Sequence, residues 1–212
     1  AEGVFQALDR LLRAKLGPRA CGAQGTTCVL ALAWHEEGAP GRFRLLLANL
    51  GDSRALVLSA SGEGGTLRLA GETADHKPEA PGETARIEAA GGKVGFSPNE
   101  HVDFQRPRVD CRLGCSRALG DFLYKGDAAL LPEQQKVSNR PDVYEFECGL
   151  GDAVVLACDG ALDVLSSRQI ADIVARELQA SDDPAAAAAA VVAAALADPR
   201  QDDNCTCVVL RT

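Results

Sequence analysis

Short apolar segments that follow one another without an intervening helix are the feature that most constrains this fold. The first three are TTCVLALAWH (26–35), RFRLLLANLGDSRALVLSA (42–60) and TLRLA (66–70), and the second contains a Gly-Asp-Ser turn between two strands. Strands joined by short turns pair antiparallel, whereas parallel strands need long crossover connections. Further strands are predicted at 142–148, 152–158 and 205–210. The sheets should therefore be largely antiparallel.

Helical periodicity appears mainly at the start and near the end of the chain. Val4, Leu8, Leu11 and Leu12 share one helix face,. Near the end, Ser166 and Gln169 form a predicted capping box ahead of an amphipathic helix, and an alanine-rich helix follows Pro184,. Helices outside antiparallel sheets predict the α+β class.

Composition excludes several kinds of partner. The net charge of -8 and the lack of a dense basic run disfavour nucleic acid,. No apolar run approaches the ~20 residues that span a bilayer, so we expect no membrane insertion. No secretory signal pattern appears either, which predicts a cytoplasmic or nuclear protein.

The eight cysteines are interpreted as free thiols. They include no CxxC pair, and a reducing compartment is the expected setting for such a chain,. With only three histidines, a zinc site has few ligands to draw on,.

Four aspartates stand where an apolar strand ends or begins: Asp52, Asp159, Asp163 and Asp203. Each one alone is typical of a turn or a cap. Several carboxylates gathered at one sheet edge would instead repel one another unless a cation lay between them. Oxygen ligands select hard ions such as Mg²⁺ or Mn²⁺.

Seven segments also carry a family resemblance. In chain order they are GTTCVLA, LLLANLGDSRALVLS, DHKPEAPGETARIEAAGGKV, CSRALGDFLYK, RPDVYEF, VVLACDGALDVLSS and DDNCTCVV. They resemble the successive motifs of the metal-dependent serine/threonine protein phosphatases of type 2C, over roughly residues 22 to 212. The resemblance implies a four-layer α-β-β-α sandwich, in which two mainly antiparallel sheets are flanked by helices and metal ions bind at one edge.

The resemblance assigns roles to the four aspartates. Asp159 and Asp203 match metal ligands of the family, with Asp202 as the alternative to Asp203. Asp52 and Asp163 match positions that, together with Asp159, hold a further, weaker ion. Two Mg²⁺ or Mn²⁺ ions and a third, weaker site are thus implied.

Other motif residues are open to two interpretations. Asp75, His76 and Lys77 match a signature that is either structural or in contact with substrate. In SRALGD, Ser116 and Arg117 are expected to shape the core beneath the site, with Asp121 as an outer acid. Arg54 and Lys125 either attract a phosphate or serve as solvated surface cations.

One part of the family pattern has no counterpart in this sequence. The family carries upstream strands and an Asp-Gly-His-Gly-Gly segment, which supply a bridging aspartate, the general acid and a phosphate-binding arginine. We therefore expect residues 1–212 to form a single phosphatase 2C-like catalytic domain lacking that segment. The general acid and the arginine would lie upstream of Ala1, and residues 126–139 would form a flap or loop.

Two functions remain in view. The first is hydrolysis of phosphoserine and phosphothreonine in phosphoprotein substrates by a metal-activated water. The enzyme is expected to be a monomer, and the 212-residue piece alone is expected to be inactive. The alternative is a non-catalytic phosphatase-like module that binds a protein or a phosphopeptide.

Overall fold

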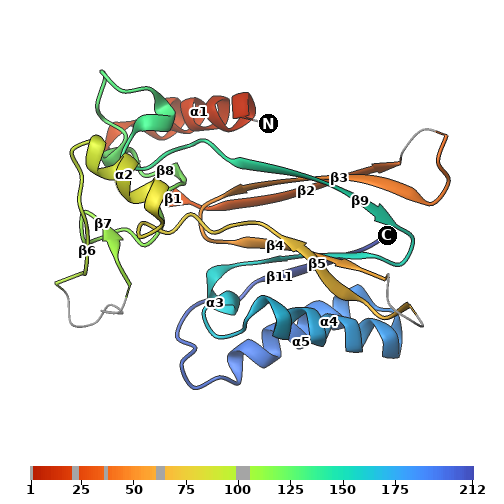
Figure 1. Cartoon of the computed structure of the whole chain (residues 1–212). Coiled ribbons are helices and arrows are strands. Elements are labelled where there is room, and N and C mark those ends of the chain that lie inside the picture. Colours follow the sequence, from red (N-terminus) through yellow and green to blue (C-terminus); the bar gives the residue numbers. More distant parts are fainter. Residues whose placement is uncertain (1, 21–23, 36–37, 61–64, 99–105) are drawn as a thin grey trace. The chain divides into compact units, whose positions relative to one another are not determined.

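The structure is a computed structural model that describes residues 2–20, 24–35, 38–60, 65–98 and 106–212 (Figure 1). The chain divides into two compact units, which are described separately below. Unit 1 comprises Ala1–Cys28, Leu50–Asp52 and Asp75–Asp142, and unit 2 comprises Val29–Asn49, Ser53–Ala74 and Val143–Thr212.

Unit 2 contains two β-sheets. The four-stranded sheet has the order β11-β10-β4-β5, formed by β4 (Arg54–Ser59), β5 (Arg68–Glu72), β10 (Ala153–Ala157) and β11 (Cys207–Arg211). All three strand pairs in it are antiparallel. The second sheet has the order β2-β3-β9, with strands β2 (Cys28–His35), β3 (Arg42–Leu50) and β9 (Asp142–Gly149).

The two sheets pack face to face through alternating apolar side chains. Leu45 and Leu47 of β3 share a buried cluster with Val57 of β4 and Val154 of β10. The next residue of β10, Val155, belongs to the cluster on the opposite face, as expected where successive strand residues point to opposite sides,.

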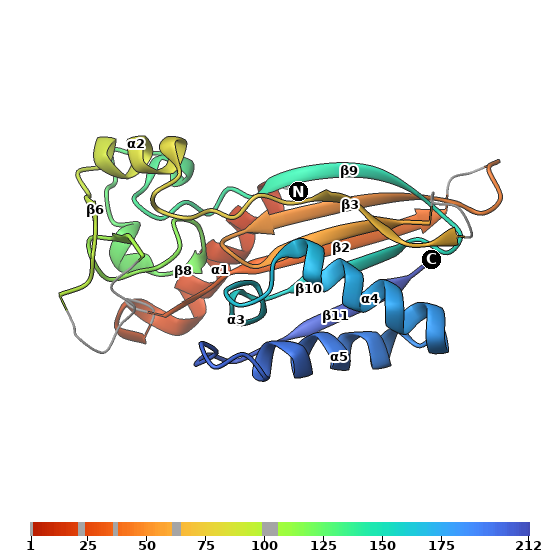
Figure 2. The same cartoon turned by 60° about the horizontal axis from the view of Figure 1, so that its bottom comes forward.

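Two helices cover that opposite face of the four-stranded sheet (Figure 2). They are α4 (Ser167–Ser181) and α5 (Pro184–Leu196), which bury Ile170, Val174 and Val191 in the same cluster as Val155. Unit 2 is thus a layer of helices on two stacked sheets. The predicted α+β class with antiparallel sheets is confirmed.

Both helices begin where the sequence predicts. The Ser166 side chain accepts a hydrogen bond from the N–H of Gln169, and Oε1 of Gln169 accepts one from the N–H of Ser166. Asp183 caps α5 by accepting from the N–H of Ala185, and Pro184 occupies the first turn. The alanine run is therefore a helix, packed by its buried face.

Unit 1 combines helices with very short strands. It contains α1 (Glu2–Ala20), α2 (Pro81–Ala89), β1 (Gly25–Thr26) paired with β8 (Leu119–Gly120), and β6 (Val94–Gly95) paired with β7 (Arg108–Val109). Its apolar core contains Ile87, Val109, Ala118 and Val137. Its described residues also form two 3₁₀ helices, Phe122–Tyr124 and Pro132–Gln134.

Within segment 126–139, the 3₁₀ helix Pro132–Gln134 is the sole regular element, and Val137, Ser138 and Asn139 are buried. In α1, the apolar face predicted from Val4, Leu8 and Leu11 is exposed. Among the side chains of this helix that the structure describes, Phe5 and Asp9 are the buried ones instead.

Among the described helices, none combines the length and apolar character needed to cross a membrane.

The described cysteines are free thiols, and one of them is expected to be unusually unreactive. Seven cysteines lie in the described ranges and none forms a disulfide, while Cys21 lies outside them. In β11, burial, aided by the charge of Cys158, raises the pKa of the Cys207 thiol to about 12. At pH 8 only about one Cys207 in ten thousand is then a thiolate, against about a quarter for an unshifted thiol of pKa ~8.5.

Alkylation with iodoacetamide, followed by mass spectrometry, tests this expectation. In the native protein Cys207 should be modified slowly, and in denaturant without reductant all eight cysteines should be labelled. Rapid native labelling of Cys207 would show that its thiol is not protected, and two unlabelled cysteines in denaturant would reveal a disulfide.

Candidate metal centre

Asp159 and Asp163 lie on one short helix at the end of β10. The strand ends at Ala157, and Asp159 begins α3 (Asp159–Leu162). The N–H of Asp163 donates to the carbonyl oxygen of Asp159 at 2.7 Å, which closes one helical turn. Residues four apart lie on the same helix face. The spacing of these two aspartates therefore places both side chains on one side of α3.

Asp203 is positioned by a loop that precedes β11. The N–H of Asp203 donates to Oε1 of Gln201 at 2.6 Å, and Oδ1 of Asp203 accepts from the N–H of Asn204 at 2.7 Å. Nε2 of Gln201 donates to the carbonyl oxygen of Gly160 at 2.7 Å. Gln201 thus connects the loop that carries Asp203 to the helix that carries Asp159.

Close backbone packing joins the same two segments. Ala157 of β10 pairs with Cys207 of β11, so the end of one strand and the start of the other lie at the same sheet edge. A Cβ atom at Gly160 would come within 2.3 Å of the carbonyl oxygen of Asn204. Only glycine lets the backbone at position 160 lie so close to Asn204. This close contact holds the Asp159 and Asp203 segments side by side.

The electrostatics agree with this proximity. The pKa of the Cys205 thiol is raised, first by burial, against a hydrogen bond from Gln201 that lowers it, and further by the charges of Cys158, Asp203 and Asp159. Both carboxylates therefore act on one side chain. Carboxylate oxygens at this edge fit a hard divalent cation.

The predicted ligands do not form a complete metal cage. In the described ranges of the chain, no three histidine, cysteine, aspartate or glutamate side chains converge closely enough to hold an ion. The structure brings the Asp159 and Asp203 segments together and places Asp163 one turn from Asp159. Asp52 belongs to unit 1.

Asp52 is buried and paired with a cation of its own unit. Its Oδ2 lies 2.7 Å from Nζ of Lys77. The turn before it is held by His76, whose Nδ1 accepts from the N–H of Gly51 and whose own N–H donates to the carbonyl oxygen of Gly51. Gly51 has a φ of 107°, and a Cβ atom there would overlap Thr27. The Asp75-His76-Lys77 signature thus stabilises the turn that presents Asp52.

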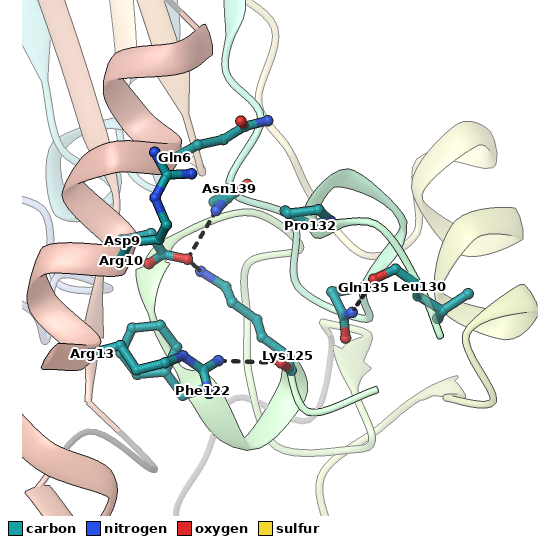
Figure 3. Close-up of a pocket in the computed structure, with 10 residues that line it drawn as sticks. All are labelled: Gln6, Asp9, Arg10, Arg13, Phe122, Lys125, Leu130, Pro132, Gln135 and Asn139. Atoms are coloured by element: carbon teal, nitrogen blue, oxygen red, sulfur yellow. Dashed lines mark hydrogen bonds and ion pairs between the residues drawn. The ribbon is translucent and has the colours of Figure 1, made fainter. Parts of the chain in front are cut away.

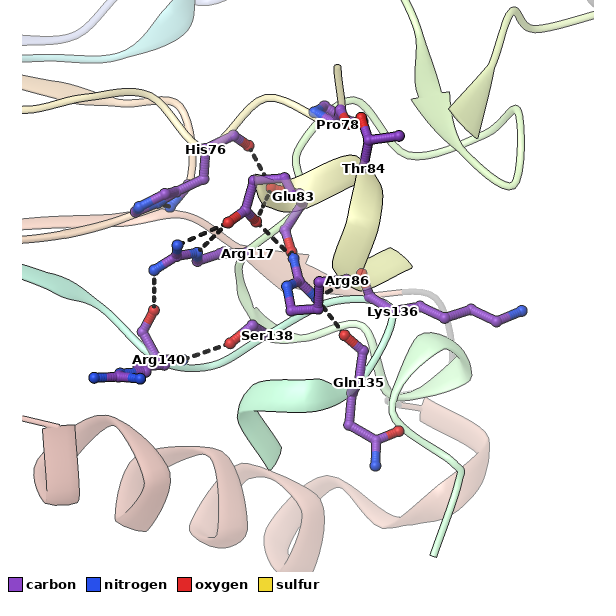
Figure 4. Close-up of polar contacts among 12 residues, drawn as sticks. His76, Pro78, Glu83, Thr84, Arg86, Arg117, Gln135, Lys136, Ser138 and Arg140 are labelled. Carbon is purple, nitrogen blue, oxygen red and sulfur yellow. Dashed lines mark hydrogen bonds and ion pairs between the residues drawn. The ribbon is translucent and has the colours of Figure 1, made fainter. Parts of the chain in front are cut away.

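A second buried network surrounds Glu83 of α2 (Figure 4). Oε1 of Glu83 accepts from Nη2 of Arg117 at 2.7 Å, and Oε2 accepts from Nη2 of Arg86 at 2.6 Å and from Oγ of Ser116 at 2.5 Å. Burial by itself would raise the pKa of Glu83, but the hydrogen bond from Arg117, the charge of Arg86 and the hydrogen bond from Ser116 together lower it to about 2. Glu83 therefore anchors the Ser116-Arg117 motif to α2.

Asp142 extends this network toward His76. Its Oδ1 accepts from Nη1 of Arg117 at 2.8 Å, and its Oδ2 lies 3.1 Å from Nε2 of His76. His76 lowers the pKa of Asp142 and Arg117 adds to the effect, against burial, to give a value of about 2. The His76 and Arg117 motifs are thus joined through one carboxylate.

Lys125 is also committed to internal contacts (Figure 3). Its Nζ donates to Oδ2 of Asp9 at 3.0 Å and to the carbonyl oxygen of Ala118 at 2.7 Å. Burial lowers the pKa of Lys125 and Asp9 opposes that shift. Burial also raises the pKa of Asp121, which Lys125 opposes and Asp9 reinforces. Lys125 is a buried structural cation rather than a surface cation.

Arg54, the other basic residue considered for phosphate, lies in unit 2. It donates from Nη1 to Oγ of Ser167 at 2.7 Å and lies 3.5 Å from Oε2 of Glu72. Sequence reasoning therefore missed the structural partners Asp9, Glu83 and Gln201. The sequence carried no signal for them, because the contacts that join them to other segments, with Lys125, Arg117 and Gly160, link residues far apart in the sequence.

Two stacked sheets, a helical layer and carboxylates at one sheet edge define an α+β domain with an acidic site. A family model described as protein phosphatase 2C matches residues 4–204 of the chain. The chain therefore belongs to the protein phosphatase 2C family.

Individual proteins similar to this chain are also named as phosphatases. "Probable protein phosphatase 2C 42" of Oryza sativa subsp. japonica is 36% identical over 166 residues, which cover 77% of this chain and 42% of the rice protein. The chain thus spans less than half the length of that curated relative. A phosphatase structure from a pathogenic strain of Toxoplasma gondii has a TM-score of 0.76 at 28% identity, covering 99% of this chain and 73% of its own. A "serine-threonine phosphatase 2C" from Toxoplasma gondii has a TM-score of 0.72 at 25% identity, covering 98% and 65%.

Proposed function

We propose that the protein hydrolyses phosphoserine and phosphothreonine in phosphoprotein substrates, using a metal-activated water. The observation that carries the proposal is the connection between the Asp159 and Asp203 segments through Gln201 and the Gly160–Asn204 contact. This connection gives two carboxylates a fixed place at one sheet edge. Membership of the protein phosphatase 2C family supports the reaction class.

In this proposal the chain's own residues hold and orient the ions. Asp159 and Asp203 bind Mg²⁺ or Mn²⁺ through carboxylate oxygens, and Asp163, one helical turn from Asp159, contributes to a further, weaker site,. When bound, a pair of such ions neutralises phosphate charge and lowers the pKa of a bound water. Gln201 keeps the two carboxylates in place by binding both segments.

Three basic residues of unit 1 bind carboxylates of the same unit. Arg86 and Arg117 both bind Glu83, and Lys125 binds Asp9. We therefore assign neither phosphate binding nor the transfer of a proton to the leaving alkoxide to these side chains.

Metal titration of aspartate variants tests the ligand assignment. Asp159→Asn and Asp203→Asn should each weaken Mn²⁺ binding at least tenfold in calorimetry, which corresponds to about 1.4 kcal/mol. Asp202→Asn is the matched control, because Asp202 is exposed, adjacent to Asp203 and carries the same charge. Loss of binding in Asp202→Asn but not in Asp203→Asn would reverse the assignment.

Hydrolysis of a phosphothreonine peptide tests the reaction itself. In a protein that joins residues 1–212 to the family's upstream Asp-Gly-His-Gly-Gly segment, we expect phosphate release with Mn²⁺, none with EDTA, and a large decrease in Asp159→Asn and Asp203→Asn. Residues 1–212 alone should release little phosphate. If the longer protein were soluble and bound Mn²⁺ normally but released no phosphate, the proposal would be contradicted and the non-catalytic binding module favoured.

A further inference from the structure

A groove of about 680 Å³ lies between β5 and α4 in unit 2. Its volume falls within the range of ~300–1,000 Å³ that is usual for ligand sites. Leu67, which directly precedes β5, Leu69 of β5, and Ala171 and Ala175 of α4 give it an apolar lining. The small alanine side chains leave room beside the strand.

The strand that forms one wall is the outer strand of its sheet. In the order β11-β10-β4-β5, the described strands pair with β5 on the β4 side only. An edge strand presents backbone N–H and C=O groups to which another extended chain can pair. The β4–β5 register is irregular at Ala70, which has no partner in β4. Arg68 and Leu69, the strand residues that line the groove, are regularly paired with β4.

The helix that forms the other wall runs antiparallel to this strand. The hydroxyl of Ser167, at the start of α4, donates to Glu72, at the end of β5. From Arg168 to Gln179 the helix rises by about 16 Å at ~1.5 Å per residue. An extended chain covers that length with about five residues at ~3.3 Å each.

The charged lining of the groove is mainly basic. Arg68, Arg168 and Arg176 line it, against the single carboxylate of Asp172. Arg68 and Arg168 are exposed, and the described residues provide neither guanidinium group with a hydrogen-bond or ion-pair partner. On a chain with a net charge of -8, this local excess of arginine favours an anionic ligand,.

We propose that the groove between β5 and α4 binds an extended, carboxylate-rich segment of a partner protein, which adds to the sheet as a strand beside β5. Backbone pairing supplies the orientation, alternate apolar side chains pack on the alanines of α4, and carboxylates bind Arg68 and Arg168. The interaction requires no metal. It is therefore a docking site separate from the proposed hydrolysis.

Binding of a fluorescein-labelled peptide with the sequence Glu-Val-Glu-Val-Glu-Val tests the proposal. Measured by anisotropy in EDTA, the peptide should bind saturably, and binding should weaken as salt is raised. Arg168→Glu should weaken binding at least tenfold, and Arg168→Gln should do so by a smaller factor. Arg10→Glu on the exposed side of α1 is the matched control and should change binding less than twofold, because it makes the same charge change outside the groove.

Two peptide variants separate strand addition from simple charge attraction. Replacing the central valine by proline removes a backbone donor and should abolish binding, as should replacing each glutamate by lysine. Hydrogen exchange should show bound-state protection of backbone amides at β5. Equal binding of the proline peptide, equal weakening by Arg10→Glu, or no saturable binding would each overturn the proposal. Because the assay contains EDTA and no phosphate ester, these outcomes are independent of phosphatase activity.

Discussion

Replacing Glu83 with alanine is expected to lower the free energy of unfolding by about 3–5 kcal/mol, the usual cost of removing one partner from a buried ion pair. Only 7% of Glu83 is exposed, and its carboxylate binds Arg86, Arg117 and Ser116. The variant leaves two guanidinium groups without their shared anion. It also releases the Ser116-Arg117 motif from α2.

Urea unfolding of Glu83→Ala and of a matched variant tests this expectation. Glu88→Ala is the control, because Glu88 lies on the same helix and is exposed. An exposed substitution of this kind should change the free energy of unfolding by less than about 0.5 kcal/mol. Equal effects of the two variants would show that the buried network contributes little to stability.

The same carboxylate should give the stability a pH dependence. The pKa of Glu83 is about 2 in the folded protein, below its ordinary value of 4.5. Below pH 4.5 unfolding therefore takes up a proton, so the contribution of Glu83 is complete above pH 4.5 and is lost as the pH falls toward 2. The difference in unfolding free energy between the wild type and Glu83→Gln should shrink across this window. A constant difference between pH 7 and pH 3.5 would contradict it.

Local patterns in the sequence predicted the elements of unit 2 well. Alternation along β10 places Val154 and Val155 in different clusters, and the Ser166 capping box begins α4 as expected. In α1, by contrast, the apolar pattern did not identify the buried face of the helix. Its periodic face of Val4, Leu8 and Leu11 is exposed, because periodicity identifies a face but not what covers it.

The buried polar residue of α1 could not be predicted from its neighbours. Asp9 is satisfied by the N–H of Gly120, by Lys125 and by Asn139, all more than 100 residues away. Burying a carboxylate is favourable only when such partners are present. Sequence spacing contains no information about them.

The candidate site shows the same division. The strand-terminal positions of Asp159 and Asp203 led us to expect both carboxylates at one sheet edge, and the antiparallel β10–β11 pair brings their segments there. The helical turn that Asp159 and Asp163 share was not predicted. Lys77 as the partner of Asp52 required the turn held by His76 and was not predicted. The sequence therefore predicted where the aspartates stand relative to the strands, but it did not predict the contacts between separate motifs.

Gly160→Ala is expected to damage the metal site without changing any of its ligands. Gly160 is part of α3, where alanine is normally favoured over glycine by about 1 kcal/mol,. The new Cβ, however, would lie 2.3 Å from the backbone oxygen of Asn204, so the loop that carries Asp203 must move. Overpacking of this kind costs about 1–3 kcal/mol. We also expect Mn²⁺ affinity to fall at least tenfold, about 1.4 kcal/mol, because the Asp159 and Asp203 segments separate.

Gly82→Ala provides the matched control, since Gly82 is also helical and a Cβ atom there meets nothing within 4 Å. That variant should keep its Mn²⁺ affinity and be equally or slightly more stable than the wild type. Calorimetric titration with Mn²⁺ and thermal unfolding in EDTA measure the two effects separately. If Gly160→Ala were destabilised but bound Mn²⁺ normally, the contact with Asn204 would be structural only, and the spacing of the two segments would not set the affinity of the site.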